Sequence, residues 1–223
     1  MTVLRLLHLC DSLFPVGGFA YSDGLESAAA RGLVCDVSQL REWLDTVLDE
    51  TVGRFEGPAV LHAHDAFVQE QWDRLATIDE ELTAMRVASA ARRSSVAVGG
   101  RVLRTWHALH PDVRLARLLA MVEDAALGPT LPVAFAAACA SADVDSRDAL
   151  EAFAYTRLAA TISCAMRLMS IGQHDAHLLL ARALDRVPEV AARAAGRASE
   201  SFAPALDIAQ MTQQYVHSRL FRS

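Results

Sequence analysis

Histidine pairs are the residues of this chain whose type and spacing come nearest to a metal site. His62 and His64 stand two residues apart, so on a regular helix they point about 200° away from each other and cannot share one ion. His174 and His177 stand three apart on a predicted helix, which is a usable spacing for two ligands. Two ligands do not complete a site. We therefore predict no metal site and keep His174 and His177 as weak candidates.

A glycine pair in the stretch FPVGGFAYSDGLESA, residues 14–28, raises the possibility of a phosphate-binding loop. Such a loop needs the pattern G-x-x-x-x-G-K-[ST] between a strand and a helix, and this chain contains no lysine and no preceding strand pattern. We therefore expect Gly17 and Gly18 to form a tight turn in which glycine allows a positive φ or a close backbone approach. The aromatic residues beside the turn, Phe19 and Tyr21, are candidates for contact with a partner.

No set of catalytic residues is visible in the sequence. The nucleophile pattern G-x-S-x-G is absent, and so is the D-D-x-x-D pattern by which all-α enzymes hold magnesium diphosphates. The acidic clusters at residues 79–81 and 143–148 lie at predicted helix ends or loops, where we expect solvated, capping carboxylates. We predict that the chain is not an enzyme and binds no cofactor directly.

Five arginines and no acidic residue lie between Arg86 and His110. On a helix, Arg93, Arg101 and Arg104 fall near one face. This face is either simply solvated or a docking surface for an acidic partner.

The chain ends in YVHSRLFRS, which places Leu220 and Phe221 between Arg219 and Arg222, shortly after Tyr215. A terminal tail without a role is usually polar and frayed. Aromatic, aliphatic and arginine side chains together have the composition of an interface hot spot. These five residues are therefore candidates for binding a partner protein.

The elements that would position these residues are all predicted helices. Apolar residues recur at helical spacing, and no stretch alternates apolar and polar residues as a half-buried strand does. We predict an all-α fold, a single domain of roughly ten helices spanning residues 1–223. The expected helices lie at residues 3–10 and 23–31, from 36 and from 57 onward, and at 70–82, 83–107, 113–127, 131–141, 146–171, 173–185, 188–202 and 206–217.

Several helix ends carry capping residues. Ser22 is expected to cap the helix at 23–31, and Gly32 to end it. Asp36 with Gln39 resembles a capping box, and Asp112 is expected to cap the helix that follows it.

Composition and charge narrow the functional classes. Hydrophobic residues make up 52% of the chain and charged residues 22%, as in a folded globular protein. The net charge of -6 argues against general binding to nucleic acid. The longest uncharged run, residues 125–142, is interrupted by Gly128, Pro129 and Pro132, so no membrane contact is expected. The four cysteines have no C-x-x-C spacing and are expected to be buried, reduced thiols of a cytoplasmic protein.

Several segments together resemble the urease accessory protein UreF family. They are, in order along nearly the whole chain, LLHLCDSLFPVGGFAYSDGLESAAARGLV, LREWL, SSVAVGGRVLRTW, SIGQHDAHLLL and SRLFRS. The block P-V-G-G-F-x-Y-S-x-G-L-E is the most specific of these, and the closing R-L-F-R-S adds to it.

The resemblance implies an all-helical, non-enzymatic scaffold that forms a homodimer. In that family the C-terminal segment, here residues 204–223, binds the accessory partner UreD, also called UreH. The scaffold also recruits the GTPase UreG, and the assembly docks on apo-urease for nickel insertion. The resemblance thus implies that partner proteins handle nickel and GTP.

The family's motif residues are carried over position by position. They are Pro15, Gly17, Gly18, Phe19, Tyr21, Ser22, Gly24 and Glu26 in the first block, Gly172 and Gln173 in the fourth, and Arg219, Leu220, Phe221, Arg222 and Ser223 at the end. The chain departs from the family's usual residues at Gln213, Gln214 and His217, and at residues 170–171 before the G-Q pair. These departures concern how the tail matches a partner.

Two other functional classes remain open from the residues alone. An all-α enzyme or small-ligand protein would build a deep pocket from scattered residues, with perturbed titratable groups. A helical nucleic-acid regulator would use the arginines of residues 86–104 and bind DNA in a salt-dependent way.

Overall fold

The computed structural model describes residues 2–16, 18–217 and 219–221, which form helices joined by loops and turns, with no strand among them. It therefore confirms the predicted all-α class, while the single-domain assignment stays a prediction. The α-helices are α1 (Thr2–Cys10), α2 (Leu25–Ala30), α3 (Val37–Thr46), α4 (Gly57–Val68), α5 (Trp72–Met85), α6 (Ser89–Leu109), α7 (Val113–Glu123), α8 (Leu131–Ser141), α9 (Ser146–Leu168), α10 (Gln173–Ala194) and α11 (Pro204–Thr212).

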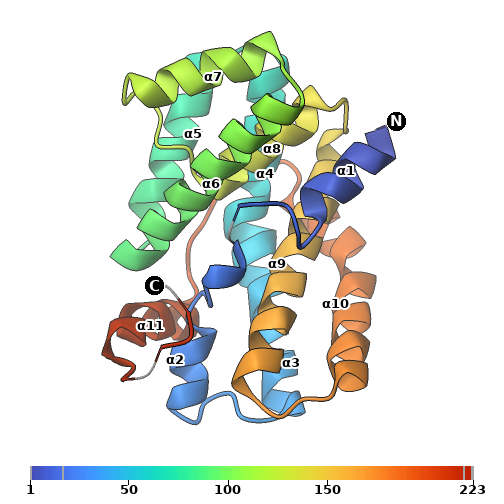
Figure 1. The fold of residues 1–223 in the computed structure, drawn as a ribbon, viewed down its shortest axis with the longest axis vertical. Helices are drawn as coiled ribbons and strands as arrows, with labels where there is room; N and C mark the ends of the chain where they lie inside the picture. Colours follow the sequence, from blue (N-terminus) through green and yellow to red (C-terminus); the bar gives the residue numbers. More distant parts are fainter. Residues whose placement is uncertain (1, 17, 218, 222–223) are drawn as a thin grey trace.

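Helices α4 and α8 form the buried centre of the fold. Every residue of α8 from Pro132 to Ala140 is buried, and most of α4 is buried as well. Helices that are apolar on all sides need neighbours on all sides. α4 accordingly packs against α5, α8 and α9, and α8 packs also against α6. Figure 1 shows α7 at the top of the molecule and α2, α3 and α10 in its lower half.

Helices α3 and α4 are joined by a π-helical segment, η2 (Val47–Glu56), so that helix runs without a break from Val37 to Val68. The sequence predicted instead a separate helix beginning at Gly57 and Pro58. Gly57 lies where the wide π turns tighten into α4, and a Cβ atom there would lie 2.3 Å from the carbonyl oxygen of Val52. Gly57 thus permits the junction rather than starting a new helix.

The predicted break between residues 185 and 188 is wrong. α10 continues through Pro188 to Ala194, although an interior proline costs a hydrogen bond and about 3 kcal/mol. Ala183, Val187 and Val190 are buried on both sides of the proline, so one apolar stripe holds the helix against its neighbours. Packing of this stripe outweighs the tendency of proline to break a helix.

Two predicted caps are confirmed and one is wrong. The side chain of Asp36 accepts from the N–H of Gln39 at 2.8 Å, and that of Asp112 accepts from the N–H of Arg114 at 2.7 Å. Ser22 does not cap a helix, because α2 begins only after Gly24 and the Ser22 hydroxyl has no hydrogen-bond partner among the described residues. Gly32, with φ +74°, follows the end of α2 as expected.

We call the motif P-V-G-G-F-x-Y-S-x-G-L-E, residues 15–26, the N-terminal block. The position in this block whose backbone requires glycine is Gly24. Its φ is +90°, and a Cβ atom would lie 2.9 Å from the backbone nitrogen of Gln210 in α11. Gly18 has no positive φ, and no described atom would lie within 4 Å of its Cβ. The reason proposed from the sequence therefore does not hold for Gly18, and Gly17 lies outside the described residues.

The cysteines are only partly as expected. Cys139 and Cys164 are buried free thiols, and burial raises the pKa of the half-buried Cys10 to about 12. Cys35 is exposed, contrary to the prediction. Within the described residues, no helix has the length and apolar character that crossing a bilayer requires.

α2, in which the N-terminal block ends, and the C-terminal segment lie side by side. α11 packs against α2, and Figure 1 shows the red C-terminal segment beside the blue α2, away from α1. The N-terminal motif block and the C-terminal segment therefore form one continuous region.

Candidate functional site

Glu26 is the residue that ties the C-terminal segment to the N-terminal block. It lies in the first turn of α2 and is 3% exposed. One carboxylate oxygen accepts from the backbone N–H of Leu220 at 2.5 Å, and the other accepts from the side-chain amide of Gln213. The oxygen of that same amide accepts from the N–H of Ser27 at 3.1 Å. Two predicted site residues, Glu26 and Leu220, are thus brought together across 194 positions of sequence.

Phe221 is the second anchor of the segment. Its ring is 4% exposed, and the guanidinium of Arg167 on α9 lies 4.3 Å from the ring centroid. A cation placed over an aromatic face in this way stabilises the contact. A third contact joins the hydroxyls of Ser27 and Thr212 at 2.8 Å. The segment is therefore docked on its own chain.

Gln213 occupies one of the positions at which the chain departs from the family's usual residues. It is 2% exposed, and its amide bonds to α2 as described above. The departure therefore lies in an internal contact and not on the outer surface of the segment. Gln214 and His217 are both exposed.

The outer face of the segment is apolar and exposed. Ile208, Met211 and Tyr215 are spaced by three and four residues, so they share one side of α11 and the short 3₁₀ turn η3 (Gln213–Tyr215) that follows it. They are 53%, 47% and 74% exposed, and Leu220 is 57% exposed. Phe202, just before α11, is exposed as well. We call these five side chains the C-terminal apolar face.

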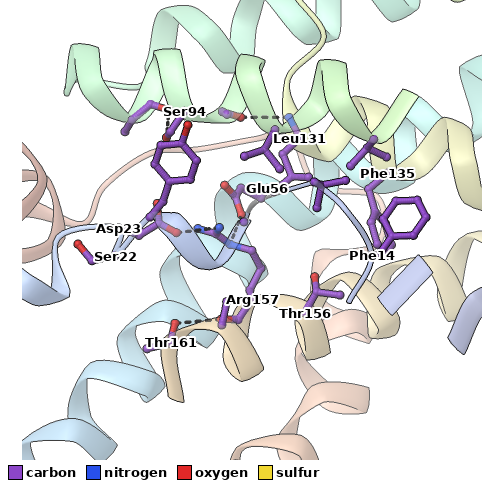
Figure 2. Close-up of a pocket in the computed structure, with 18 of the residues that line it drawn as sticks. Phe14, Ser22, Asp23, Glu56, Ser94, Leu131, Phe135, Thr156, Arg157 and Thr161 are labelled. Atoms are coloured by element: carbon purple, nitrogen blue, oxygen red, sulfur yellow. Dashed lines mark hydrogen bonds and ion pairs between the residues drawn. The ribbon is translucent and has the colours of Figure 1, made fainter. Parts of the chain in front are cut away.

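A pocket lies between the N-terminal block and helices α6, α8 and α9. Its volume is about 130 Å³. Figure 2 shows Phe14 and Phe135 at one side of it and the charged residues Asp23, Glu56 and Arg157 toward the other. Tyr21 and Ser22 also line it, and these two are predicted site residues.

The charged side of the pocket is a buried ion network. Glu56 is 1% exposed and pairs with Arg86 and, at 3.1 Å, with Nε of Arg157. Arg157 also pairs with Asp23 at 2.8 Å. Burial alone would lower the pKa of Arg157, but the carboxylates of Asp23 and Glu56 raise it. The guanidinium of Arg157 is therefore held in its charged form.

Local structure explains how these charges meet. Asp23 has a positive φ of 48° and precedes Gly24, so the chain turns sharply there and directs the carboxylate toward α9. Glu56 is the last residue of the π-helical segment, and π turns are frequent at functional sites. Sequence reasoning missed this network. One signal of this network was visible in the sequence. Arg157 is a single charged residue within the largely apolar stretch FAYTRLAATI, residues 153–162.

The three arginines of α6 do not form one set. Arg93 and Arg104 are exposed, but Arg101 is half-buried and its Nε donates to the carbonyl oxygen of Val16 at 2.6 Å. Arg101 therefore holds the N-terminal loop in place. Arg93 and Arg104 remain available as a basic surface.

The remaining predicted residues are distributed elsewhere. His174, His177 and Gln173 are exposed in the first turns of α10, and the described residues include no group of three or more side chains suited to a metal ion. Arg219 is exposed and takes part in an interaction within the chain. The side chain of Phe19 and the residue Arg222 lie outside what the structure describes.

Comparison with known proteins identifies the family. A family model described as UreF matches residues 34–184. The urease accessory protein UreF of Delftia acidovorans is 32% identical, over 98% of this chain and 95% of its own length. The proteins of that name from an Azoarcus strain and from Rhizobium leguminosarum are 32% and 33% identical, each over 96% of its length. The chain belongs to the UreF family.

Membership confirms the resemblance read from the motif blocks. The relatives are named accessory proteins, which agrees with the prediction that this UreF-family chain is not an enzyme. The family model begins at residue 34, whereas the relatives match nearly the full chain, including the N-terminal block and the C-terminal segment.

Proposed function

We propose that the chain is a scaffold in the maturation of urease. In this proposal it binds a UreD/UreH-type accessory protein through its C-terminal segment and brings the GTPase UreG to apo-urease. Nickel is the cargo of the assembly, and the partner proteins handle nickel and GTP. Family membership supports the accessory role, and the surface of the segment supports protein binding.

The observation that carries the proposal is the C-terminal apolar face. Four large apolar side chains of the segment, and Phe202 just before it, are exposed, whereas Leu206, Ala209 and Phe221 on the inner side of the segment are buried. Water-exposed apolar patches of this kind mark protein interaction sites. Tyrosine is among the residues most enriched in binding hot spots. The segment is therefore ordered by its own chain and offers its other side to a partner.

Arg93 and Arg104 supply a second surface. Both are exposed on α6, and the described part of α6 has no acidic residue between them. A basic surface attracts an acidic partner and speeds its association. We assign this surface to UreG or apo-urease, with homodimer formation and a cytoplasmic location as further parts of the proposal.

A pull-down of co-expressed urease accessory proteins tests the proposal. The double variant Tyr215→Ala/Leu220→Ala should weaken binding of the UreD-type partner by roughly 30-fold or more, because losing a hot spot costs about 2 kcal/mol or more. The control is Val113→Ala/Leu178→Ala, since both residues are exposed apolar residues outside the segment. The control should bind as the unaltered chain does.

Circular dichroism on each purified variant shows whether the variant is folded. If a folded Tyr215→Ala/Leu220→Ala protein still co-purifies with the UreD-type partner at the unaltered level, the C-terminal apolar face is not the binding surface and the proposal fails in that part.

A further inference from the structure

Gln213 is the only buried polar side chain among the described residues of the C-terminal segment. It is the first residue of η3, directly after α11, and is 2% exposed. Its amide NH₂ donates to one carboxylate oxygen of Glu26, and its amide oxygen accepts from the backbone N–H of Ser27 at 3.1 Å. One side chain of the segment thus makes two buried hydrogen bonds to the start of α2.

The chemistry of these two partners restricts which side chains can serve at position 213. The N–H of Ser27 can only donate, whereas the ionised carboxylate of Glu26 can only accept. The side chain between them must therefore supply one donor and one acceptor, which a carboxamide does. An ionised carboxylate would place a like charge beside Glu26, and an apolar side chain would leave buried polar groups unpaired.

This bridge between the segment and α2 fixes the position of the C-terminal apolar face. Gln213 stands between Met211 and Tyr215, which are 47% and 74% exposed. The other carboxylate oxygen of Glu26 accepts from the backbone N–H of Leu220, whose side chain is 57% exposed. The pair of Gln213 and Glu26 therefore determines where three side chains of the face stand on the molecule.

A close backbone approach limits how the segment can respond to a change in this bridge. A Cβ atom at Gly24 would lie 2.9 Å from the backbone nitrogen of Gln210 in α11. Since the two backbones are already in contact, a side chain that Glu26 repels at position 213 has to carry the segment away from α2. Loss of the bridge should therefore release the segment.

We propose that Gln213 is the positioning residue of the C-terminal apolar face: it faces α2, touches no partner and acts through Glu26 and Ser27. The effect on partner binding rests on the proposed function, in which this face binds the UreD-type protein. A released segment has no fixed arrangement of its apolar side chains, so the partner has to order it first. The apparent affinity then falls in proportion to the docked fraction of the chain.

Three variants separate this role from a merely structural one. Gln213→Glu puts two carboxylates into one buried site, and at about pH 5 such a pair shares a proton, which restores the missing donor. Gln213→Met has similar length but no donor or acceptor, so a change of pH cannot restore its bonds. The matched control is Gln214→Glu, because Gln214 is exposed and the same charge is introduced one residue further along.

The measurements are hydrogen exchange on the free full chain and titration with the UreD-type partner, each at about pH 7 and about pH 5. At about pH 7, Gln213→Glu should lower exchange protection in α11 by roughly 30-fold or more and weaken partner binding by a similar factor. At about pH 5, both values should return to within about threefold of the unaltered chain at that pH.

The other two variants should show no such dependence on pH. Gln213→Met should lose about tenfold or more in both measurements at either pH, because buried groups on α2 stay unpaired. Gln214→Glu should stay within about threefold of the unaltered chain throughout. Circular dichroism establishes that each variant is folded, and if Gln213→Glu unfolds as a whole near neutral pH, Gln213→Met carries the test there.

Four results would overturn the proposal. They are an α11 without exchange protection in the unaltered chain, a folded Gln213→Glu protein that behaves as Gln214→Glu does, no recovery of Gln213→Glu at about pH 5, and a loss of partner binding with unchanged exchange in α11. The last result would mean that Gln213 contacts the partner directly. Failure of the unaltered chain to bind the partner would contradict the proposed function alone, because the exchange measurements need no partner.

Discussion

At the scale of single residues, Glu26 is the side chain on which the docked C-terminal segment most depends. Its two carboxylate oxygens accept from Leu220 and Gln213, and both bonds join α2 to the C-terminal segment. Nothing in the local sequence around Glu26 indicates this role, because the bonds span more than 180 positions. The motif block did place Glu26 among the site residues, while its partner Gln213 entered only as a departure from the family pattern.

We predict that Glu26→Ala destabilises the chain by about 2–3 kcal/mol, because it leaves the buried donors of Gln213 and Leu220 without acceptors. Urea unfolding measures the loss. Hydrogen exchange should also speed up selectively in residues 204–221. The exposed Glu123→Ala should change the free energy of unfolding by less than about 0.5 kcal/mol. Unchanged exchange in the segment would mean that Glu26 does not hold it.

Asp79 makes the stability of the chain depend on pH. The prediction of a solvated carboxylate is wrong for Asp79, which lies inside α5, is 2% exposed and accepts from the N–H and the hydroxyl of Thr130 at 2.7 and 2.6 Å. Burial raises its pKa from 3.8 to about 6, although the bonds from Thr130 act in the opposite direction. The folded state therefore favours the neutral acid. The contribution of Asp79 is fully present below pH 3.8 and is lost as the pH rises through about 6.

We predict that the free energy of unfolding falls by up to about 3 kcal/mol between pH 4 and pH 7 because of this one group. Other carboxylates titrate in the same range, so the unaltered chain is compared with Asp79→Asn by urea unfolding across it. As the pH rises, the free energy of unfolding of the unaltered chain should fall relative to that of Asp79→Asn. A difference that stays constant from pH 4 to pH 7 contradicts the shifted pKa of Asp79.

At the scale of elements, the contact between α6 and the start of α8 depends on one glycine of an adjacent pair. A Cβ atom at Gly99 would lie 2.0 Å from the carbonyl oxygen of Pro129, whereas one at Gly100 would meet only the side chain of Arg104, at 3.3 Å. The pair thus lies in close packing within an unbroken helix.

We predict that Gly99→Ala destabilises the chain by about 3 kcal/mol or more, since backbone must move to admit the methyl group. Gly100→Ala should be neutral or stabilising by up to about 1 kcal/mol, because alanine is the better helix former. Thermal unfolding of both variants provides the measurement. Equal effects of the two substitutions would contradict the close approach at Gly99.

The elements that the sequence predicted well are those whose signals are local. The caps at Asp36 and Asp112 need only neighbouring residues, and both are confirmed. The sequence-based predictions were wrong where contacts between residues far apart in the sequence determine the course of a helix. Pro188 stays inside α10 because buried residues on both sides hold it, and the π-helical segment before Gly57 has no signature in hydrophobic spacing.

At the scale of the whole molecule, two surfaces of different kinds coexist. The C-terminal apolar face is exposed on the outside of the molecule, and the pocket beside Glu56 and Arg157 is lined by a buried ion network. The family and the all-α class could be predicted from motif order and helical periodicity. The pocket could not, because its charges come from four separate parts of the chain that only the tertiary fold brings together.

The nickel content of urease purified from cells that lack only this chain tests the central claim most directly. Urease should accumulate at its normal level but contain little nickel, and supplying the chain in trans should restore both nickel and activity. The Tyr215→Ala/Leu220→Ala variant should fail to restore them, and the Val113→Ala/Leu178→Ala control should succeed. Urease that is fully loaded with nickel in the absence of the chain would contradict its role as a maturation scaffold.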